Sequence, residues 1–156
     1  MPLKLAEKFS ERIDPKNWLI SEKLDGVRCL WTGKQLFTRD GVQLAVPEYF
    51  TFDFPSSPID GELYLGRGNY TKLSQILLNK DRADSDWLAI TFIAIDAPQL
   101  NVTFKQRLEA MERVFSLSST LFLKLIQFEP CSGIEHMNQR LEELTTQGNL
   151  YLASSE

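Results

Sequence analysis

The sequence has few of the residues that build metal centres or disulfide frameworks. It contains one histidine, His136, and two cysteines, Cys29 and Cys131. Cys29 lies in a strand-like run and Cys131 follows a proline far downstream, so neither has a partner at the spacing of a zinc site. We therefore exclude a Cys/His zinc site, interpret both cysteines as structural thiols, and expect His136 to be a solvated helix residue.

A long apolar run is also missing from the N-terminal part of the chain. Residues 1–14 are interrupted by charges at Lys4, Glu7, Lys8, Glu11 and Arg12. A signal peptide or a membrane span needs an uninterrupted hydrophobic stretch, and this region has none. The sequence as it stands predicts an intracellular protein without a membrane segment, and we expect residues 1–15 to be an N-terminal extension.

The chain has no excess of basic charge. Its formal net charge is −4 and its pI is about 5.1. A protein that grips a nucleic acid along the phosphates normally presents a basic face. The overall charge therefore predicts weak affinity for DNA.

Length and patterning predict one α+β domain. The 156 residues are 43% hydrophobic, which is enough for one core, and no internal repeat is found. Residues 18–24 and 27–37 are expected to pair as a hairpin, with Gly33 at the next turn, and residues 47–58 to form a proline-rich loop. The other elements expected from periodicity are strands at 59–65, 88–95, 121–128 and 150–152, and helices at 70–78, 104–115 and 134–144. This order predicts antiparallel sheets with helices packed outside.

Lys23 is the strongest candidate for chemistry. It lies in Ser21-Glu22-Lys23-Leu24-Asp25-Gly26-Val27-Arg28, where an apolar strand leads to an Asp-Gly turn. A lysine amine becomes a nucleophile when it loses its proton or when nearby cationic groups lower its pKa, and Arg28 or a bound cation would serve that purpose. The alternative is a surface hairpin with solvated charges.

Two downstream segments carry further candidates. Asp60 and Glu62, in Ile59-Asp60-Gly61-Glu62-Leu63-Tyr64, are an acidic pair at i and i+2, for which the alternative is an edge strand with two solvated acids. The turn Gly66-Arg67-Gly68 lacks the spacing and lysine of a P-loop and the third glycine of a dinucleotide fingerprint. We interpret it as a turn that positions Arg67 for a phosphate or a carboxylate.

Together these segments resemble the nucleotidyltransferase superfamily of ATP-dependent DNA ligases, RNA ligases and mRNA capping enzymes. Lys23 to Arg28 matches its motif Lys-x-Asp-Gly-x-Arg, and Asp60 to Tyr64 looks like its Asp-Gly-Glu motif. The minimal bacterial ATP-dependent DNA ligases are the most similar type. The resemblance to them covers residues 16 to about 115 and includes the following segments: Thr38-Arg39-Asp40-Gly41, Tyr49-Phe50, Gly66-Arg67-Gly68-Asn69-Tyr70, Asp96-Ala97-Pro98 and Phe104-Lys105-Gln106-Arg107-Leu108.

The resemblance implies an ATP-grasp-like adenylation domain and a role for each matching residue. Lys23 would attack the α-phosphorus of ATP, Arg28 would bind near the ribose and phosphates, and Arg39 would meet the 5′-phosphate of nicked duplex DNA. Glu62, with Asp60 beside it, would contact the ribose or hold Mg²⁺, a hard cation that prefers oxygen ligands. Arg67 would bind substrate. The implied activity is nick sealing in DNA repair, recombination and replication.

The sequence departs from the family pattern in three places. Ile95 stands where the family has a phenylalanine that stacks on adenine, which predicts weaker adenine binding at this cofactor-binding position. Gln147-Gly148 replaces the expected acidic metal ligand, and the sequence ends before the Lys-x-Lys motif. We therefore expect residues 16–156 to be a C-terminally truncated adenylation domain without its OB-fold, which a partner would have to supply.

Three functional hypotheses remain at this point. The first is a DNA ligase adenylation domain. The second is a noncatalytic remnant that binds a nucleotide or a protein partner. The third is an RNA ligase or a capping-type nucleotidyltransferase; a preference for GTP would indicate a capping enzyme, whereas ligases use ATP.

Overall fold

The computed structural model describes residues 12–81, 83–144 and 149–153, the last of these by their backbone. Residues 1–11 and Gln147-Gly148, on which two of the sequence predictions depend, lie outside these ranges. The strands are β1 Leu19–Lys23, β2 Val27–Trp31, β3 Leu36–Thr38, β4 Ile59–Tyr64, β5 Thr91–Asp96, β6 Leu123–Leu125, β7 Glu129–Pro130 and β8 Asn149–Ala153. The helices are α1 Glu48–Thr51, α2 Tyr70–Leu78, the 3₁₀ helix η1 Asp84–Ala89, α3 Phe104–Phe115 and α4 Ile134–Glu143.

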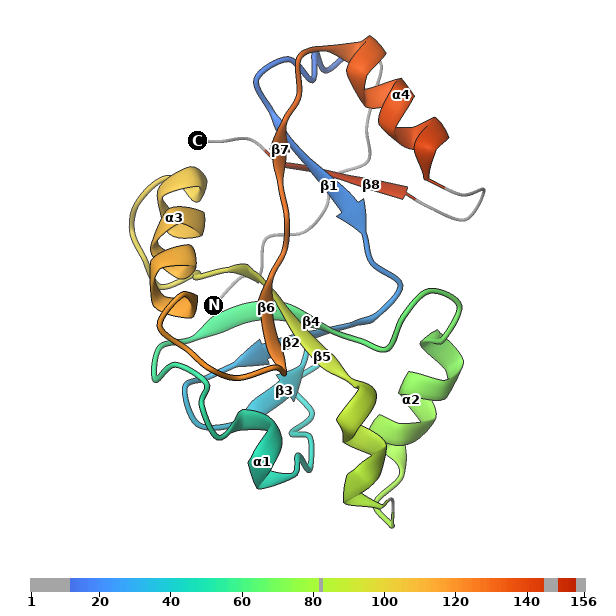
Figure 1. Cartoon of the computed structure of the whole chain (residues 1–156), viewed down its shortest axis with the longest axis vertical. Coiled ribbons are helices and arrows are strands. Elements are labelled where there is room, and N and C mark those ends of the chain that lie inside the picture. The colour runs from blue at the N-terminus through green and yellow to red at the C-terminus, as the bar shows by residue number, and fades with distance from the viewer. Residues whose placement is uncertain (1–11, 82, 145–148, 154–156) are drawn as a thin grey trace.

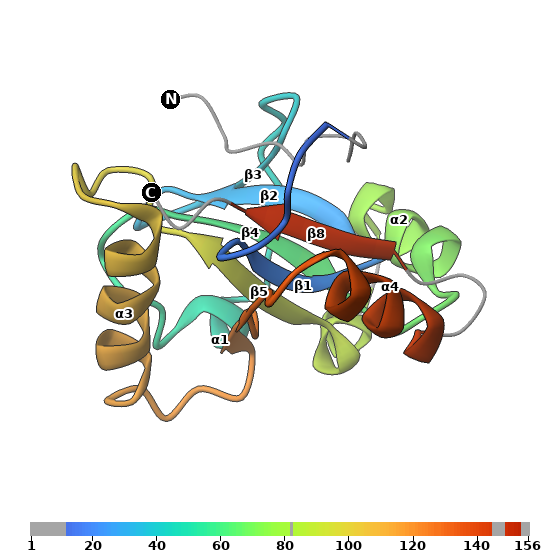
Figure 2. The ribbon, with the colours of Figure 1, turned by 90° about the horizontal axis from the view of Figure 1, so that it is seen from above.

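The strands form two sheets (Figure 1). The large sheet has the order β3-β2-β4-β5-β6, and the small one has the order β7-β1-β8. All pairings are antiparallel except that of β5 with β6, which is parallel. The predicted α+β class with antiparallel sheets is confirmed, and the pairing of β5 with β6 adds one parallel pair that the sequence did not predict. Figure 2 shows the small sheet lying over the large one, with α3 and α2 at opposite ends.

The hairpin predicted for residues 18–24 and 27–37 is wrong. β1 pairs with β7 and β8, which come from the C-terminal part of the described chain, whereas β2 pairs with β3 and β4. The Asp25-Gly26 turn therefore carries the chain from one sheet to the other. The hairpin lies one turn later, between β2 and β3, where Gly33 adopts a positive φ of 97° that few other residues tolerate.

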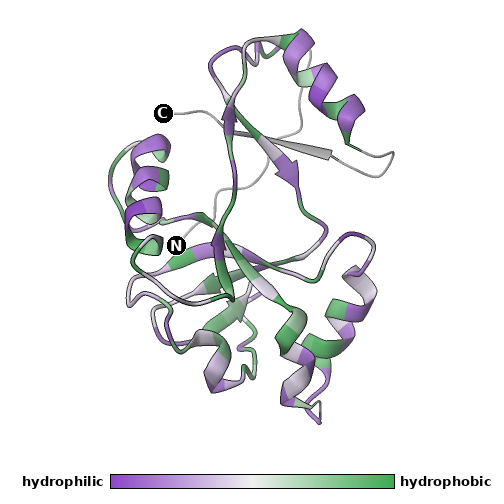
Figure 3. Cartoon of the chain, viewed as in Figure 1, coloured by the Kyte–Doolittle hydropathy of each residue, from purple (hydrophilic) through white to green (hydrophobic). Residues whose placement is uncertain are grey.

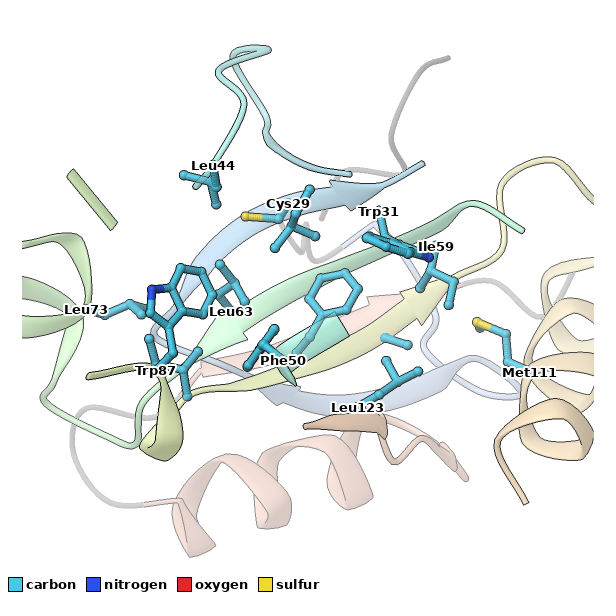
Figure 4. Packing of buried hydrophobic residues seen from close by; sticks show 14 of the residues in the cluster. Cys29, Trp31, Leu44, Phe50, Ile59, Leu63, Leu73, Trp87, Met111 and Leu123 are labelled. Atoms are coloured by element: carbon cyan, nitrogen blue, oxygen red, sulfur yellow. The ribbon is translucent and has the colours of Figure 1, made fainter. Parts of the chain in front are cut away.

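The core lies on one side of the large sheet (Figure 4). Side chains from β2, β4, β5, β6, α1 and η1 meet there, and its largest fully buried members are Trp87, Phe50 and Phe92. Phe50 contacts Trp87 edge-on, with ring centroids 4.9 Å apart. Each such side chain contributes about 1.5–3 kcal/mol by leaving water, so this cluster fixes the position of β4 and β5 in the sheet.

The helices α2 and α3 begin and end at the residues that the sequence predicts. α3 starts at a capping box, in which the Thr103 hydroxyl accepts a hydrogen bond from the Gln106 backbone N–H and the Gln106 side chain accepts one from the Thr103 N–H. It buries Phe104 and Met111 on one face. Hydrophilic and hydrophobic residues alternate along α3 and α4 in Figure 3, as expected for helices that pack on a sheet and face solvent.

Three element predictions need correction. The proline-rich region 47–58 contains the short helix α1, whose Phe50 is drawn into the core. The strand predicted at 88–95 begins only at Thr91, because the preceding residues form η1 and bury Trp87. The strand predicted at 121–128 is reduced to β6, and the chain then leaves the large sheet to add β7 to the small one.

The remaining sequence predictions concern the thiols, the histidine and the membrane. Both cysteines are buried and free, and burial raises the pKa of the Cys29 thiol to about 12. His136 is half-buried rather than solvated, because its Nδ1 accepts a hydrogen bond from the Ser132 backbone N–H at 3.1 Å. Among the helices of the described residues, none is both long and apolar enough to cross a membrane.

Candidate nucleotide-binding site

Lys23 lies where the chain passes from the small sheet to the large one. It is the last residue of β1, and its side chain is exposed. Its neighbours Glu22 and Leu24 line a cavity of about 520 Å³. Lys23 itself is not among the residues that line this cavity.

The cavity is bounded by β1 on one side and by β4, β5 and the segment leading from β6 to β7 on the other. Its volume is typical of a small-molecule site. Both apolar and charged side chains line it, as follows: Ile20, Ser21, Glu22, Leu24, Tyr64, Ile93, Lys124, Leu125, Ile126, Gln127, Phe128, Glu129 and Arg140. It can therefore hold a molecule that has both an apolar and a polar part.

The turn after Lys23 is held against β4 by Glu62. The Gly26 N–H donates a hydrogen bond of 3.1 Å to Glu62 Oε1. Burial raises the pKa of Glu62, although Arg28, the Gly26 N–H and the nearby Lys23 ammonium act in the opposite direction. Glu62 thus links the lysine, the turn and the central strand of the large sheet.

Only glycine fits at position 26. A Cβ there would lie 2.2 Å from the Leu63 carbonyl oxygen and 2.9 Å from Glu62 Cγ. We expect Gly26→Ala to lower the free energy of unfolding by about 3 kcal/mol, the upper end of the usual cost of overpacking, as measured by urea denaturation.

Gly41→Ala is the matched control for this substitution. Gly41 has a φ of 85°, and an added Cβ would meet nothing within 4 Å, so only backbone strain of about 1–2 kcal/mol is expected. Equal losses in the two variants would show that the close approach of the turn to β4 is not what requires Gly26.

Arg28 and Asp60 form a buried ion pair between β2 and β4. Arg28 Nε donates to Asp60 Oδ1 at 2.7 Å, and Nη2 donates to Oδ2 at 2.6 Å. The Asp60 side chain is 0% exposed and that of Arg28 is 17% exposed. The pKa of Asp60 is raised, chiefly by burial, although Arg28 acts in the opposite direction. Since β4 is the middle strand of its sheet, the alternative of a solvated edge-strand acidic pair is excluded.

A second buried carboxylate lies next to Asp60. Asp96 on β5 is its cross-strand partner, and Arg107 of α3 binds Asp96 through Nε at 2.6 Å and Nη2 at 3.2 Å. The Asp96 charge contributes to the raised pKa of Asp60. The two buried carboxylates therefore bind different arginines, Asp60 binding Arg28 and Asp96 binding Arg107.

Arg67 is exposed and contacts a carboxylate. Its Nε donates to Glu22 Oε1 at 2.8 Å, which connects the turn after β4 to the residue preceding Lys23. Of the two interpretations left open by the sequence, the carboxylate is the partner observed.

Arg39 lies next to Arg28, because its backbone N–H donates a hydrogen bond of 3.2 Å to the Arg28 carbonyl oxygen. It is exposed and lines a second cavity of about 500 Å³, together with Arg28, Tyr70, Ser74 and Lys80 among others. Arg28 borders this second cavity while its guanidinium binds Asp60, so the structure brings Arg28 and Arg39 to a common surface.

Ile95 occupies a bulge in β5. Gly61 pairs with Ala94 and Asp60 pairs with Asp96, so Ile95 is the extra residue on its strand. Its side chain is 3% exposed, and it does not line the cavity, whereas Ile93 does. Phe92, an aromatic residue on the same strand, is 0% exposed in the core and so does not replace the missing ring.

The sequence analysis overlooked Tyr64, Ile93 and Arg140, all of which line the first cavity. The position of Tyr64 was open to prediction, because it follows Glu62 by two residues on a strand and so shares its face. Arg140 gave no such signal, since it lies on α4 and reaches the cavity only through the packing of the small sheet.

The acidic residues do not form a metal centre by themselves. Within the described residues, no group of three or more His, Cys, Asp or Glu side chains is placed to hold a metal ion. Asp60 is fully buried with both oxygens bound to Arg28, so it does not fit the role of a Mg²⁺ ligand. Glu62 is only half-buried, and Mg²⁺ commonly uses one carboxylate together with substrate phosphates.

Comparison with known proteins finds DNA ligases among both the curated sequences and the solved structures. No protein-family model matches the chain. A DNA ligase from Haemophilus influenzae is 34% identical over 129 residues, which are 83% of this chain and 47% of that protein. This chain therefore spans about half the length of the curated relative that it matches.

Solved structures show the same similarity. A Lig E DNA ligase, described as binding DNA with a minimal scaffold, has a TM-score of 0.92 at 28% identity and covers 99% of this chain and 62% of its own. The Chlorella virus DNA ligase–adenylate has a TM-score of 0.72 at 12% identity, with 97% of this chain and 59% of its own covered. At that low identity, the second similarity concerns the fold alone.

Proposed function

Because this chain belongs to the ATP-dependent DNA ligase family, we propose that residues 16–156 form an adenylation domain that transfers AMP from ATP to Lys23. The observation that carries this proposal is the position of Lys23 at the end of β1, between two residues that line a cavity of nucleotide size. We expect the exposed amine, on a residue flanked by two that line the cavity, to meet a phosphate that extends out of it while the rest of the nucleotide lies inside.

The reaction is a substitution at the α-phosphorus. The Lys23 nitrogen, after loss of a proton, forms the new N–P bond, and the bond to the bridging oxygen breaks so that pyrophosphate leaves. The product is a lysyl-AMP phosphoramidate. Glu62 accepts a hydrogen bond from the Gly26 N–H and feels the charge of Lys23, so it fixes the turn that follows the lysine.

Arg28 is the residue that we assign to the ribose and the phosphates. Its guanidinium is fixed by Asp60 through two hydrogen bonds, which reduces the loss of side-chain entropy when a ligand binds. Asp60 thus acts as a positioning residue. Positioning of this kind contributes to catalysis because the reacting groups are already oriented.

We assign Mg²⁺ binding to Glu62 and not to Asp60. The half-buried Glu62 would hold the cation together with the phosphates of the substrate, whereas Asp60 is occupied by Arg28. When bound, Mg²⁺ supplies neutralisation of the phosphate charge. Arg67 is the second group that we expect to contact substrate, since a phosphate would compete with Glu22 for its guanidinium.

Nicked duplex DNA is the proposed second substrate, and Arg39 the residue for its 5′-phosphate. Arg39 is exposed on a surface that also carries Arg28 and Lys80. We expect Arg39→Ala to weaken binding of a nicked duplex and to reduce the slope of log K against log salt by about 1, as measured by fluorescence anisotropy over a salt series. An unchanged salt slope would show that Arg39 meets no phosphate.

The relatives are longer than this chain, so we separate two activities. Adenylation of Lys23 is proposed for the residues present here. Nick sealing is proposed to require segments that correspond to the remainder of those proteins, in the same polypeptide or supplied by a partner.

The direct test is incubation of the purified chain with labelled ATP and Mg²⁺, followed by mass analysis under denaturing conditions. An added AMP that survives denaturation is expected, and labelled GTP should give none. A folded protein without an adduct would contradict the proposal, and an adduct formed from GTP instead would favour a capping-type enzyme.

A further inference from the structure

The cavity beside Lys23 has the form of a slot between two walls. Ile20, Glu22 and Leu24 alternate along and just beyond β1 and line it from the small sheet. Tyr64 of β4 and Ile93 of β5 line it from the large sheet. A planar, apolar group fits between such walls better than a compact, charged one.

Tyr64 is placed to be the main flat surface of this slot. Glu62 pairs with Ile93 and Tyr64 pairs with Thr91, so Tyr64 and Ile93 are diagonal neighbours on adjacent strands. Burial raises the pKa of the Tyr64 hydroxyl, and the Glu22 carboxylate adds to this effect. The ring therefore lies partly out of water, close to the residue that precedes Lys23.

The other aromatic residues near the slot are held elsewhere. Phe128 also lines it, but its ring packs edge-on against Phe104 at 5.4 Å and an angle of 88°. Phe92 is stacked on Phe54 in the core, with centroids 5.9 Å apart. Ile95 is buried in its bulge. Among the described aromatic side chains that line the slot, Tyr64 thus remains as the one that can face a ligand.

We propose that the Tyr64 ring is the platform on which the purine base of the nucleotide stacks, with Ile93 beside it and β1 on the opposite side of the base. The proposal rests on the proposed adenylation function and adds a specificity-determining residue to it. It also changes the expectation drawn from Ile95: the aromatic contact missing from β5 is provided by β4. Stacking of a base on an aromatic side chain is worth about 1–3 kcal/mol.

The test compares Tyr64→Leu and Tyr64→Phe with the unmodified chain. Binding of ATP and of tripolyphosphate is measured by calorimetry. Tyr64→Leu should bind ATP about tenfold more weakly while its affinity for tripolyphosphate stays the same, and Tyr64→Phe should bind both like the unmodified chain. Tyr70→Leu is the matched control, because Tyr70 is an exposed tyrosine on α2 that does not line this slot.

A fluorescent probe reports the stacking itself. The triphosphate of 2-aminopurine riboside loses fluorescence when its base stacks on an aromatic ring, so quenching is expected with the unmodified chain and with Tyr64→Phe but not with Tyr64→Leu. Circular dichroism and a thermal melt establish that each variant is folded.

The outcomes separate this inference from the function on which it rests. If the unmodified chain binds ATP and is adenylated but Tyr64→Leu binds ATP equally well, the platform is not Tyr64 and the adenylation function stands. If Tyr64→Leu loses tripolyphosphate and ATP affinity to the same degree, its role is structural and the inference is overturned. If the folded, unmodified chain binds no ATP, both proposals fail.

Discussion

Replacement of Lys23 by alanine is expected to abolish covalent AMP completely. The side chain is exposed and lies at the end of β1, so its loss should change the free energy of unfolding by no more than about 0.5 kcal/mol. Noncovalent binding of ATP should persist, because the cavity walls are unchanged. The measurement is intact-protein mass after incubation with labelled ATP and Mg²⁺, together with ATP binding by calorimetry.

Two further lysine variants make this result specific. Lys23→Arg keeps the positive charge but cannot lose its proton under these conditions, so it should also give no adduct. Lys34→Ala removes an exposed lysine in the turn between β2 and β3 and should be labelled like the unmodified chain. Labelling that persists in Lys23→Ala would place the nucleophile elsewhere and remove the basis of the proposed function.

The sequence predicted elements best where the signals are local. α2 and α3 have the predicted bounds, because amphipathic spacing and a capping box act within a few residues. The hairpin prediction failed for the opposite reason. β1 is held by β7 and β8, more than 100 residues away in the chain, and no local pattern reports such a pairing.

In the candidate site, too, the residues identified by a local motif were predicted, whereas contacts between distant parts of the chain were not. The motif identified Lys23, Arg28 and Glu62, and the structure brings these three residues together around the Gly26 turn. The partners of the charged groups were not predictable. That Asp60 is bound to Arg28, and Arg67 to Glu22, depends on how β1, β2 and β4 cross in space.

Loss of the Asp60 carboxylate is expected to be the most destabilising single change at the site. In Asp60→Ala, the guanidinium of Arg28 remains largely buried without the carboxylate that now compensates its charge. Breaking a buried pair in this way typically costs about 3–5 kcal/mol, which should appear as a lower urea midpoint.

An exposed ion pair provides the control for this effect. Glu129 and Arg140 are bonded at 2.5 Å, but their side chains are 44% and 40% exposed. Glu129→Ala should therefore cost at most about 1 kcal/mol. A loss for Asp60→Ala that is no larger than this would contradict the view that burial makes the Asp60 pair important.

Replacing both Arg28 and Asp60 distinguishes the contribution of this ion pair to stability from its proposed role in adenylation. Arg28 and Asp60 are both largely buried, and taking two charges out of water offsets much of their attraction. Replacing both residues with apolar ones, as in Arg28→Met with Asp60→Leu, should therefore recover most of the stability that Asp60→Ala loses. The double variant should still fail to form lysyl-AMP, because the proposed contact of Arg28 with the ribose and phosphates is gone. A double variant that is stable and fully adenylated would show that Arg28 serves only the fold, and the assignment of Arg28 to the nucleotide would be withdrawn.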